Sequence, residues 1–425
     1  MNRVGGAAAT RLPAIGALTG QVSLALGSLM LQVVAARALG AEGLGQFALL
    51  FGYVVMATAV STGLVGDSLT VLDRHSPAVR SALVTAAVAT IAIAATTAFV
   101  LAAHLGWVTA ALFALATAAF MAADLLRRTL MACQRFWSLV AVDGLALVAA
   151  AATLLVASRS GPLSLAHVVA ALAVGQLTAC VVATRCLPVE ERRLARLGVA
   201  ALPSVLRFGG WRALQQFVRP TMLNAARWLV LLAAGHAAVG ELEAARVFVA
   251  PAMLLVQGVA SYLFASYAAD RDQPVPVLLR RADRAAVTML AGCSLMAVAA
   301  ALSAPLLGPI LTGGRFDLAV LAVLGWGAYA ASCAAVLPYG SLAAVRGAPA
   351  RVLALRVVDS AVAVLATAVA VLMMGMPFTW VPWVLSAGSF LGGYLCRTLL
   401  LAPRASGATR SEPTPSEPRD LAVNP

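Results

Sequence analysis

Long apolar runs separated by short polar connectors fill most of the chain, from about residue 12 to residue 401. A helix needs about 20 consecutive apolar residues to cross the hydrocarbon core of a bilayer, and about twelve runs reach that length. The pattern therefore predicts an all-α polytopic membrane protein with about twelve transmembrane helices. The approximate limits of the runs are Leu12–Ala36, Leu44–Gly66, Val79–Ala103, Trp107–Leu126, Leu139–Ala157, Leu165–Leu187, Trp211–Ala234, Glu243–Tyr267, Ala285–Leu311, Leu318–Ala344, Val352–Gly375 and Phe378–Leu401.

The spacing of the connectors predicts two six-helix halves around a central cavity. The longest connector, residues 188–210, is basic and separates an N-terminal half, residues 1–187, from a C-terminal half, residues 211–402. Residues 403–425 are polar and rich in Pro and Ser, so we expect a disordered cytoplasmic tail. The first run is preceded by Arg3 and Arg11, as in a signal peptide, but it continues for about 25 residues, which favours a retained membrane anchor.

Composition narrows the class of protein. Hydrophobic residues make up 62% of the chain and charged residues 11%, which excludes a soluble enzyme, a disordered chain and a secreted disulfide scaffold. The six cysteines are scattered and form no CxxC pair, so we interpret them as small apolar packing residues. The sequence contains no HExxH motif, P-loop or Rossmann glycine pattern, and we therefore expect no metal, no cofactor and no enzymatic activity.

The basic residues predict the orientation of the chain in the membrane. Thirty basic residues, all of them arginine, stand against 17 acidic ones, and they are scattered between the apolar runs rather than gathered in a patch for nucleic acid. With the N-terminus in the cytoplasm, the cytoplasmic connectors and ends hold 24 of the 30 arginines. Because short cytoplasmic loops are enriched in Arg, both termini are expected in the cytoplasm of a bacterium, with the helices in its inner membrane. Six arginines remain: Arg37, Arg159, Arg219, Arg227, Arg246 and Arg315.

A short internal match supports the division into halves. The turn after the first run reads Leu44-Gly45-Gln46-Phe47, and the turn after the seventh reads Val239-Gly240-Glu241-Leu242, 195 residues later. Both follow an apolar-Gly-polar-apolar pattern at the same place in their half. This match indicates a same-direction repeat, a common plan among transporters, in which the substrate site lies between the two repeats.

The first of these turns also carries a resemblance to a known family. The segment from Ala36 to Phe47 reads Ala-Arg-Ala-Leu-Gly-Ala-Glu-Gly-Leu-Gly-Gln-Phe. It resembles the first-loop signature of Wzx-like polysaccharide flippases, R-x-L-G-x-x-x-[FY]-G-x-[FY], with Leu44 in place of the first aromatic residue. These flippases belong to the multidrug/oligosaccharidyl-lipid/polysaccharide exporter superfamily. The resemblance implies transfer of a lipid-linked oligosaccharide from the cytoplasmic to the outer leaflet by alternating access.

A flippase of this kind must carry a polyprenyl pyrophosphate and its glycan through a medium of low dielectric constant. Arginine suits such an anion because its guanidinium group stays charged and binds phosphate oxygens with two donors. The seventh helix places Arg219, Arg227, Gln215 and Gln216 within about 120° of one another, on one face. Arg219 lies near the middle of the membrane. Pro220 is a candidate for a kink that opens a cavity.

Other polar positions complete the candidate substrate site: Arg246 and Gln257 on the eighth helix, and Gln32 and Arg37 on the first. Each has a structural alternative. Arg246 can pair with its acidic neighbours Glu241 and Glu243 or reach the interface. Gln32 can join two helices, and Arg37 can anchor the end of its helix. The expected partners are a polyprenyl-pyrophosphate-linked glycan, membrane lipids and other polysaccharide-assembly proteins, and no nucleic acid.

The carboxylates bear on the two alternative functions. Asp67, Asp124, Asp143 and Asp359 lie near predicted helix ends, where we expect them to pair with arginines. A cation-coupled small-molecule or drug exporter should instead have a deep unpaired carboxylate, and the sequence shows none. A membrane glycosyltransferase or polymerase is disfavoured because the external connectors are short.

Overall fold

The computed structural model describes residues 6–192, 196–270, 273–345 and 349–403, with side chains at nearly every position from Leu26 onward. All regular structure in these ranges is helical. The α-helices are α1 Gly6–Ser61, α2 Asp67–Val71, α3 Pro77–Ala102, α4 Trp107–Ala132, α5 Phe136–Ser160, α6 Leu165–Cys186, α7 Val189–Arg192, α8 Leu202–Ala269, α9 Val275–Thr312, α10 Val320–Val345, α11 Pro349–Ala368 and α12 Val381–Leu395. Short 3₁₀ or π-helical turns lie at Thr62–Gly66, Ala103–Leu105, Val369–Met373, Phe378–Trp380 and Cys396–Leu401.

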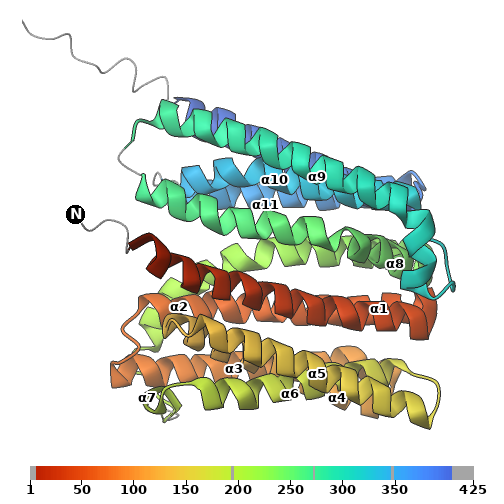
Figure 1. Ribbon diagram of the computed structural model, residues 1–425, viewed down its shortest axis with the longest axis horizontal. Helices are drawn as coiled ribbons and strands as arrows, with labels where there is room; N and C mark the ends of the chain where they lie inside the picture. The colour runs from red at the N-terminus through yellow and green to blue at the C-terminus, as the bar shows by residue number, and fades with distance from the viewer. Residues whose placement is uncertain (1–5, 193–195, 271–272, 346–348, 404–425) are drawn as a thin grey trace, which may run out of the picture.

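Two of the helices contain a reversal of the chain. Gly40 in α1 has φ 71° and ψ −167°, and Gly235 in α8 has φ 81° and ψ −177°. Glycine adopts these angles without steric cost because it has no Cβ. α1 begins at the end of the bundle where α2 also lies, so the two arms of α1 run in opposite directions (Figure 1).

Ten segments of the described chain are long and apolar enough to cross a membrane. Two of them, Leu26–Leu69 and Leu202–Met253, contain Gly40 and Gly235 and therefore hold two spans each. The prediction of an all-helical protein with about twelve spans is confirmed.

The centre of the chain differs from the predicted limits. α8 begins at Leu202 rather than Trp211, because Arg207 near the end of a span interrupts the apolar run without interrupting the helix. The segment before α8 packs against α3, where the Thr85 hydroxyl donates to the Gly198 carbonyl over 3.0 Å. Residues 404–425, predicted to be a disordered tail, lie outside the described residues.

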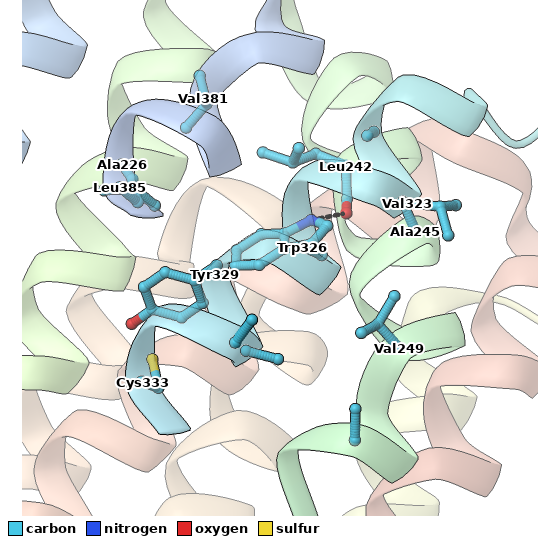
Figure 2. Packing of buried hydrophobic residues seen from close by; sticks show 14 of the residues in the cluster. Ala226, Leu242, Ala245, Val249, Val323, Trp326, Tyr329, Cys333, Val381 and Leu385 are labelled. Carbon is cyan, nitrogen blue, oxygen red and sulfur yellow. Dashed lines mark hydrogen bonds between the residues drawn. The ribbon is translucent and has the colours of Figure 1, made fainter. Parts of the chain in front are cut away.

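The helices form two groups, with α1 and α8 in the middle between them. α3–α6 lie on one side of these two long helices and α9–α11 on the other (Figure 1). The core of the second group centres on α10, where the Trp326 indole donates a hydrogen bond to the Leu242 carbonyl over 2.9 Å (Figure 2). The Trp326 and Tyr329 rings meet edge to face, with centroids 5.6 Å apart. This core ties α10 to the second arm of α8.

The two halves meet in a reciprocal contact between α1 and α8, at the end of the bundle that carries Gly40 and Gly235. A Cβ atom on Gly45 would lie 1.9 Å from the carbonyl oxygen of His236, and one on Gly240 would lie 1.8 Å from that of Ala41. Ala41 and His236 are separated by 195 residues, as are Gly45 and Gly240. The segments that suggested a repeat in the sequence therefore pack against each other as equivalent partners.

Candidate functional site

Three cavities lie along the first arm of α8. The first has a volume of about 360 Å³ and lies between the halves, among α1, α4, α5, α6 and α8. The second, of about 60 Å³, lies among α8, α10, α11 and α12. The third, of about 800 Å³, has mostly apolar walls contributed by α1, α3, α4 and α8.

The first cavity carries a cluster of charged side chains, which we call the arginine–glutamate cluster: Arg227, Glu243 and Arg246. The Nε atoms of Arg227 and Arg246 each donate to a different oxygen of the Glu243 carboxylate, both over 2.7 Å. The side chain of Glu243 is 1% exposed, whereas those of Arg227 and Arg246 are 10% and 25% exposed. Two guanidinium groups against one carboxylate leave one net positive charge at the cavity wall.

Amide side chains connect this cluster to the N-terminal half. Arg227 Nη1 donates to Asn224 Oδ1 over 2.8 Å, and Asn224 Nδ2 donates to the Gly52 carbonyl over 2.7 Å. Arg246 Nη2 donates to Gln32 Oε1 over 3.0 Å. The predicted residues Arg227, Arg246 and Gln32 are thus brought together, and Gln32 acts as the interhelical bridge that was its structural alternative.

Gly52 leaves the space that this arrangement needs. A Cβ atom there would lie 2.1 Å from Asn224 Oδ1 and 2.5 Å from Arg227 Nη1. Any side chain at this position would displace the pair. Neither Gly52 nor Asn224 was recognisable as a candidate site residue from the sequence alone.

The cluster has donors that remain available to a ligand. Arg227 and Arg246 both line the first cavity. Within the described residues, Arg227 Nη2 and Arg246 Nη1 donate no hydrogen bond to the protein. An anion in the cavity could therefore be bound by both guanidinium groups without first breaking their bonds to Glu243.

Arg219 lies in the second cavity, apart from Arg227. Its Nε donates to the Tyr329 hydroxyl over 3.3 Å, its Nη2 contacts the Cys333 sulfur, and its guanidinium lies 5.5 Å from the centre of the Tyr329 ring. Arg356 and Asp359 share the same wall. The expectation of one cavity for both arginines is wrong because α8 is packed between the halves, so positions about 80° apart on it face different sides.

The contacts of the remaining candidate residues are mainly structural. Gln215 lines the second cavity and accepts a hydrogen bond from Arg212, whereas Gln216 is exposed and lines none of the three cavities. Arg37 is exposed and donates to the Ile310 carbonyl over 2.7 Å, which joins the halves near Gly40. The side chain of Gln257 lies outside the described residues.

Three of the carboxylates pair with arginine, as predicted. Asp67 lies 2.9 Å from Arg212, Asp124 lies 2.8 Å from Arg128, and Asp143 lies 3.2 Å from Arg127. Asp143 also lines the first cavity, where its buried Oδ2 has no hydrogen-bond partner among the described residues. Asp359 lines the second cavity and accepts from the Ser360 hydroxyl. Each of the two cavities is thus lined by a carboxylate that the sequence placed only near a helix end.

Comparison with known proteins identifies the fold. No protein-family model matches the chain, and no curated protein matches it. Among solved structures, an inward-facing multidrug resistance MATE family transporter of the MOP superfamily superposes with a TM-score of 0.67 at 14% identity, over 94% of this chain and 100% of the other. An outward-facing structure of such a transporter gives a TM-score of 0.57 at 13% identity, over 94% and 97% of the two chains.

A third similar structure is a MOP superfamily transporter from Pyrococcus furiosus Vc1 (DSM3638), for which a reversed polarity of the binding pocket has been taken to suggest a different function. Its TM-score is 0.55 at 13% identity, over 93% of this chain and 97% of the other. The chain therefore has the fold of MATE transporters of the MOP superfamily. Its similarity is greater to the inward-facing than to the outward-facing structure.

Proposed function

We propose that this protein is an alternating-access transporter that moves a lipid-linked oligosaccharide across the cytoplasmic membrane, with the pyrophosphate of the carrier lipid bound by Arg227 and Arg246. The observation that carries this proposal is the first cavity, where two arginines from the two arms of α8 each have a nitrogen that donates to no described residue. A pyrophosphate offers several oxygens to such a pair, and each guanidinium has one nitrogen that bonds to no described residue and can donate to them.

The free energy of moving an anion through the membrane also supports anion binding by Arg227 and Arg246. An anion that leaves water for a medium of low dielectric constant loses a large hydration energy unless fixed cations replace it. Holding an arginine in the membrane is itself unfavourable by about 2.5–3.5 kcal/mol on insertion scales, so such a residue normally has a function or a partner. Arg227 and Arg246 have Glu243 as a partner, and both side chains line the cavity in which the ligand would bind.

The shared fold supports transport by exchange between two open states. The contact between Gly45 and Gly240 and the bond from Arg37 to Ile310 close one end of the bundle, which the arginine pattern predicts to be the external end. In the proposed transport cycle, these contacts separate when the cavity opens to the outside. Enzymatic glycosyl transfer is not proposed, since the similar structures are transporters.

A second candidate is a cation-coupled exporter of small organic molecules. Asp143 and Asp359 favour it, because each carboxylate lines a cavity, and the buried Oδ2 of Asp143 has no hydrogen-bond partner among the described residues, so that a proton could bind there. The multidrug resistance transporters with the same fold point to this function as well. The positive charge of the arginine–glutamate cluster argues for an anion in the first cavity.

Reconstitution into proteoliposomes distinguishes the two candidates. Leaflet-to-leaflet movement of a fluorescent lipid-linked oligosaccharide is compared with efflux of the organic cation ethidium. Arg227→Ala and Arg246→Ala should each reduce lipid movement by about tenfold or more. Arg284→Ala, which removes an exposed arginine outside the three cavities, should leave it unchanged. Ethidium efflux without lipid movement in the unaltered protein would instead establish the exporter.

A further inference from the structure

We propose that Glu243 is an internal counter-ion that competes electrostatically with the phosphate of the substrate for Arg227 and Arg246, and so sets the affinity of the first cavity for anions. This inference rests on the proposed function, because it concerns how the same cavity binds and releases its ligand. It assigns Glu243 the role of a specificity-determining residue that acts through the arginines.

The geometry of Glu243 fits a built-in counter-ion. Each carboxylate oxygen accepts from the Nε of one arginine at 2.7 Å, and the side chain is 1% exposed. The bonds use the Nε edge of each guanidinium, while Arg227 Nη2 and Arg246 Nη1 stay unbonded to the described protein. A phosphate can therefore approach the outer edge while Glu243 remains on the inner edge.

The backbone around Glu243 is fixed from two sides. The preceding carbonyl, that of Leu242, accepts a hydrogen bond from the Trp326 indole (Figure 2). Gly240, three residues before Glu243, is in the close contact with the Ala41 carbonyl. The backbone of Glu243 is thus packed on two sides while this end of the bundle is closed, and a ligand would then bind beside the carboxylate rather than push it aside.

The charge balance shows why a transporter benefits from this carboxylate. Two arginines without Glu243 would present two positive charges in a site of low dielectric constant, where attraction to a pyrophosphate is strongest. With Glu243 present, the cluster keeps one net positive charge. Transport requires a site that is attractive enough to fill and weak enough to empty. Glu243 lowers the affinity toward that range and also stabilises the arginines when the cavity is empty.

The test measures anion binding by the full chain in lipid nanodiscs, with geranylgeranyl pyrophosphate as the probe and uncharged geranylgeraniol for comparison. Glu243→Gln keeps the shape of the side chain and removes its charge. We expect the dissociation constant for the pyrophosphate to fall by about tenfold, with no change for geranylgeraniol. Glu241→Gln is the matched control, since it removes a half-buried carboxylate two residues away that makes no bond to either arginine.

The outcomes separate this inference from the proposed function. If the unaltered protein binds the pyrophosphate through Arg227 and Glu243→Gln binds it no more tightly, the counter-ion role is overturned and the proposed function stands. If neither protein binds the pyrophosphate better than geranylgeraniol, the proposed function fails and this inference fails with it.

A second variant covers the case in which Glu243→Gln does not fold. Glu243→Asp keeps the charge but shortens the side chain, so that it can no longer bridge both Nε atoms. It should tighten pyrophosphate binding by a smaller factor than Glu243→Gln. Unchanged or weaker binding by Glu243→Asp, or loss of folded protein in both variants, would overturn the proposal, because Glu243 would then be a structural ion-pair partner only.

Discussion

The role of each arginine in a membrane-spanning segment depends on the side chains that it contacts. Arg219 and Arg227 are eight residues apart on one helix, yet Arg219 contacts Tyr329 and Cys333 whereas Arg227 binds Glu243 and Asn224. The first set of partners is neutral and the second includes a buried carboxylate. Only the second arginine belongs to a charged group that spans both arms of α8.

Gly52 is the residue on which the position of Arg227 depends most directly. In Gly52→Ala, the new methyl group would lie 2.1 Å from Asn224 Oδ1, so Asn224 and Arg227 must move. We expect the folded state to be destabilised by about 1–3 kcal/mol and the affinity for geranylgeranyl pyrophosphate to fall. Thermal unfolding and binding in nanodiscs measure the two effects.

Gly27→Ala is the matched control for this substitution. Gly27 lines the same cavity, but a Cβ atom there would meet no atom within 4 Å. It should leave both the affinity and the unfolding temperature unchanged. Equal loss of affinity in the two variants would show that Gly52 does not position Arg227.

The candidate site was only partly predictable from the sequence. The arginines were recognisable because a charged residue inside an apolar run is unfavourable without a purpose. Glu243 lies three residues before Arg246, a spacing that places the two side chains on one helical face, so their pairing was accessible. Gly52 and Asn224 carried no signal, because their roles depend on how α1 packs against α8. Helical angles fix directions around one helix but not which neighbour lies in each direction.

At the scale of elements, α1 and α8 resemble each other more closely than their sequences do. Each reverses at a glycine with positive φ, and the two glycines are separated by 195 residues. Each then presents a second glycine that packs against the other helix, Gly45 on α1 and Gly240 on α8. The apolar runs predicted the number of spans because bilayer thickness fixes span length. They did not predict the start of α8 at Leu202, because a helix can continue past the membrane surface.

The contact between these glycines should control closure of this end of the bundle. In Gly240→Ala, the methyl group would lie 1.8 Å from the Ala41 carbonyl, which is backbone and cannot rotate away. We expect the two halves to separate there and the population of the outward-open state to rise. Spin labels at Glu42 and Ala237, both exposed and 195 residues apart, would report longer distances in pulsed electron resonance.

Gly292→Ala controls for the insertion of a methyl group into a helix. Gly292 lies within α9 and has open space where its Cβ would be. The distance distribution between the labels should match that of the unaltered protein. An unchanged distribution in Gly240→Ala as well would mean that the glycine contact does not hold this end closed.

In the whole molecule the arginines serve two functions: some line cavities, and the others determine the predicted orientation in the membrane. Of the six arginines outside the cytoplasmic set, Arg219, Arg227 and Arg246 line cavities within the bundle. Arg356, one of the 24 arginines predicted to be cytoplasmic, also lines the second cavity. This leaves Arg37, Arg159 and Arg315 for the predicted external end, against 23 for the predicted cytoplasmic side. The asymmetry that predicts the orientation is therefore steeper than the sequence count alone indicates.

This asymmetry predicts which surface of the protein faces the cytoplasm. His75, between α2 and α3, and Ser160, the last residue of α5, are both exposed and are predicted to lie on opposite sides of the membrane. A single cysteine is introduced at each position. In a cysteine-free background, a membrane-impermeant maleimide added to intact cells should label Ser160→Cys and leave His75→Cys unlabelled until the membrane is permeabilised. Because the arginines of the cytoplasmic connectors resist translocation, the opposite labelling pattern would require those charges to have crossed the membrane. It would reverse the orientation, and it would place the closed Gly45–Gly240 contact on the cytoplasmic side.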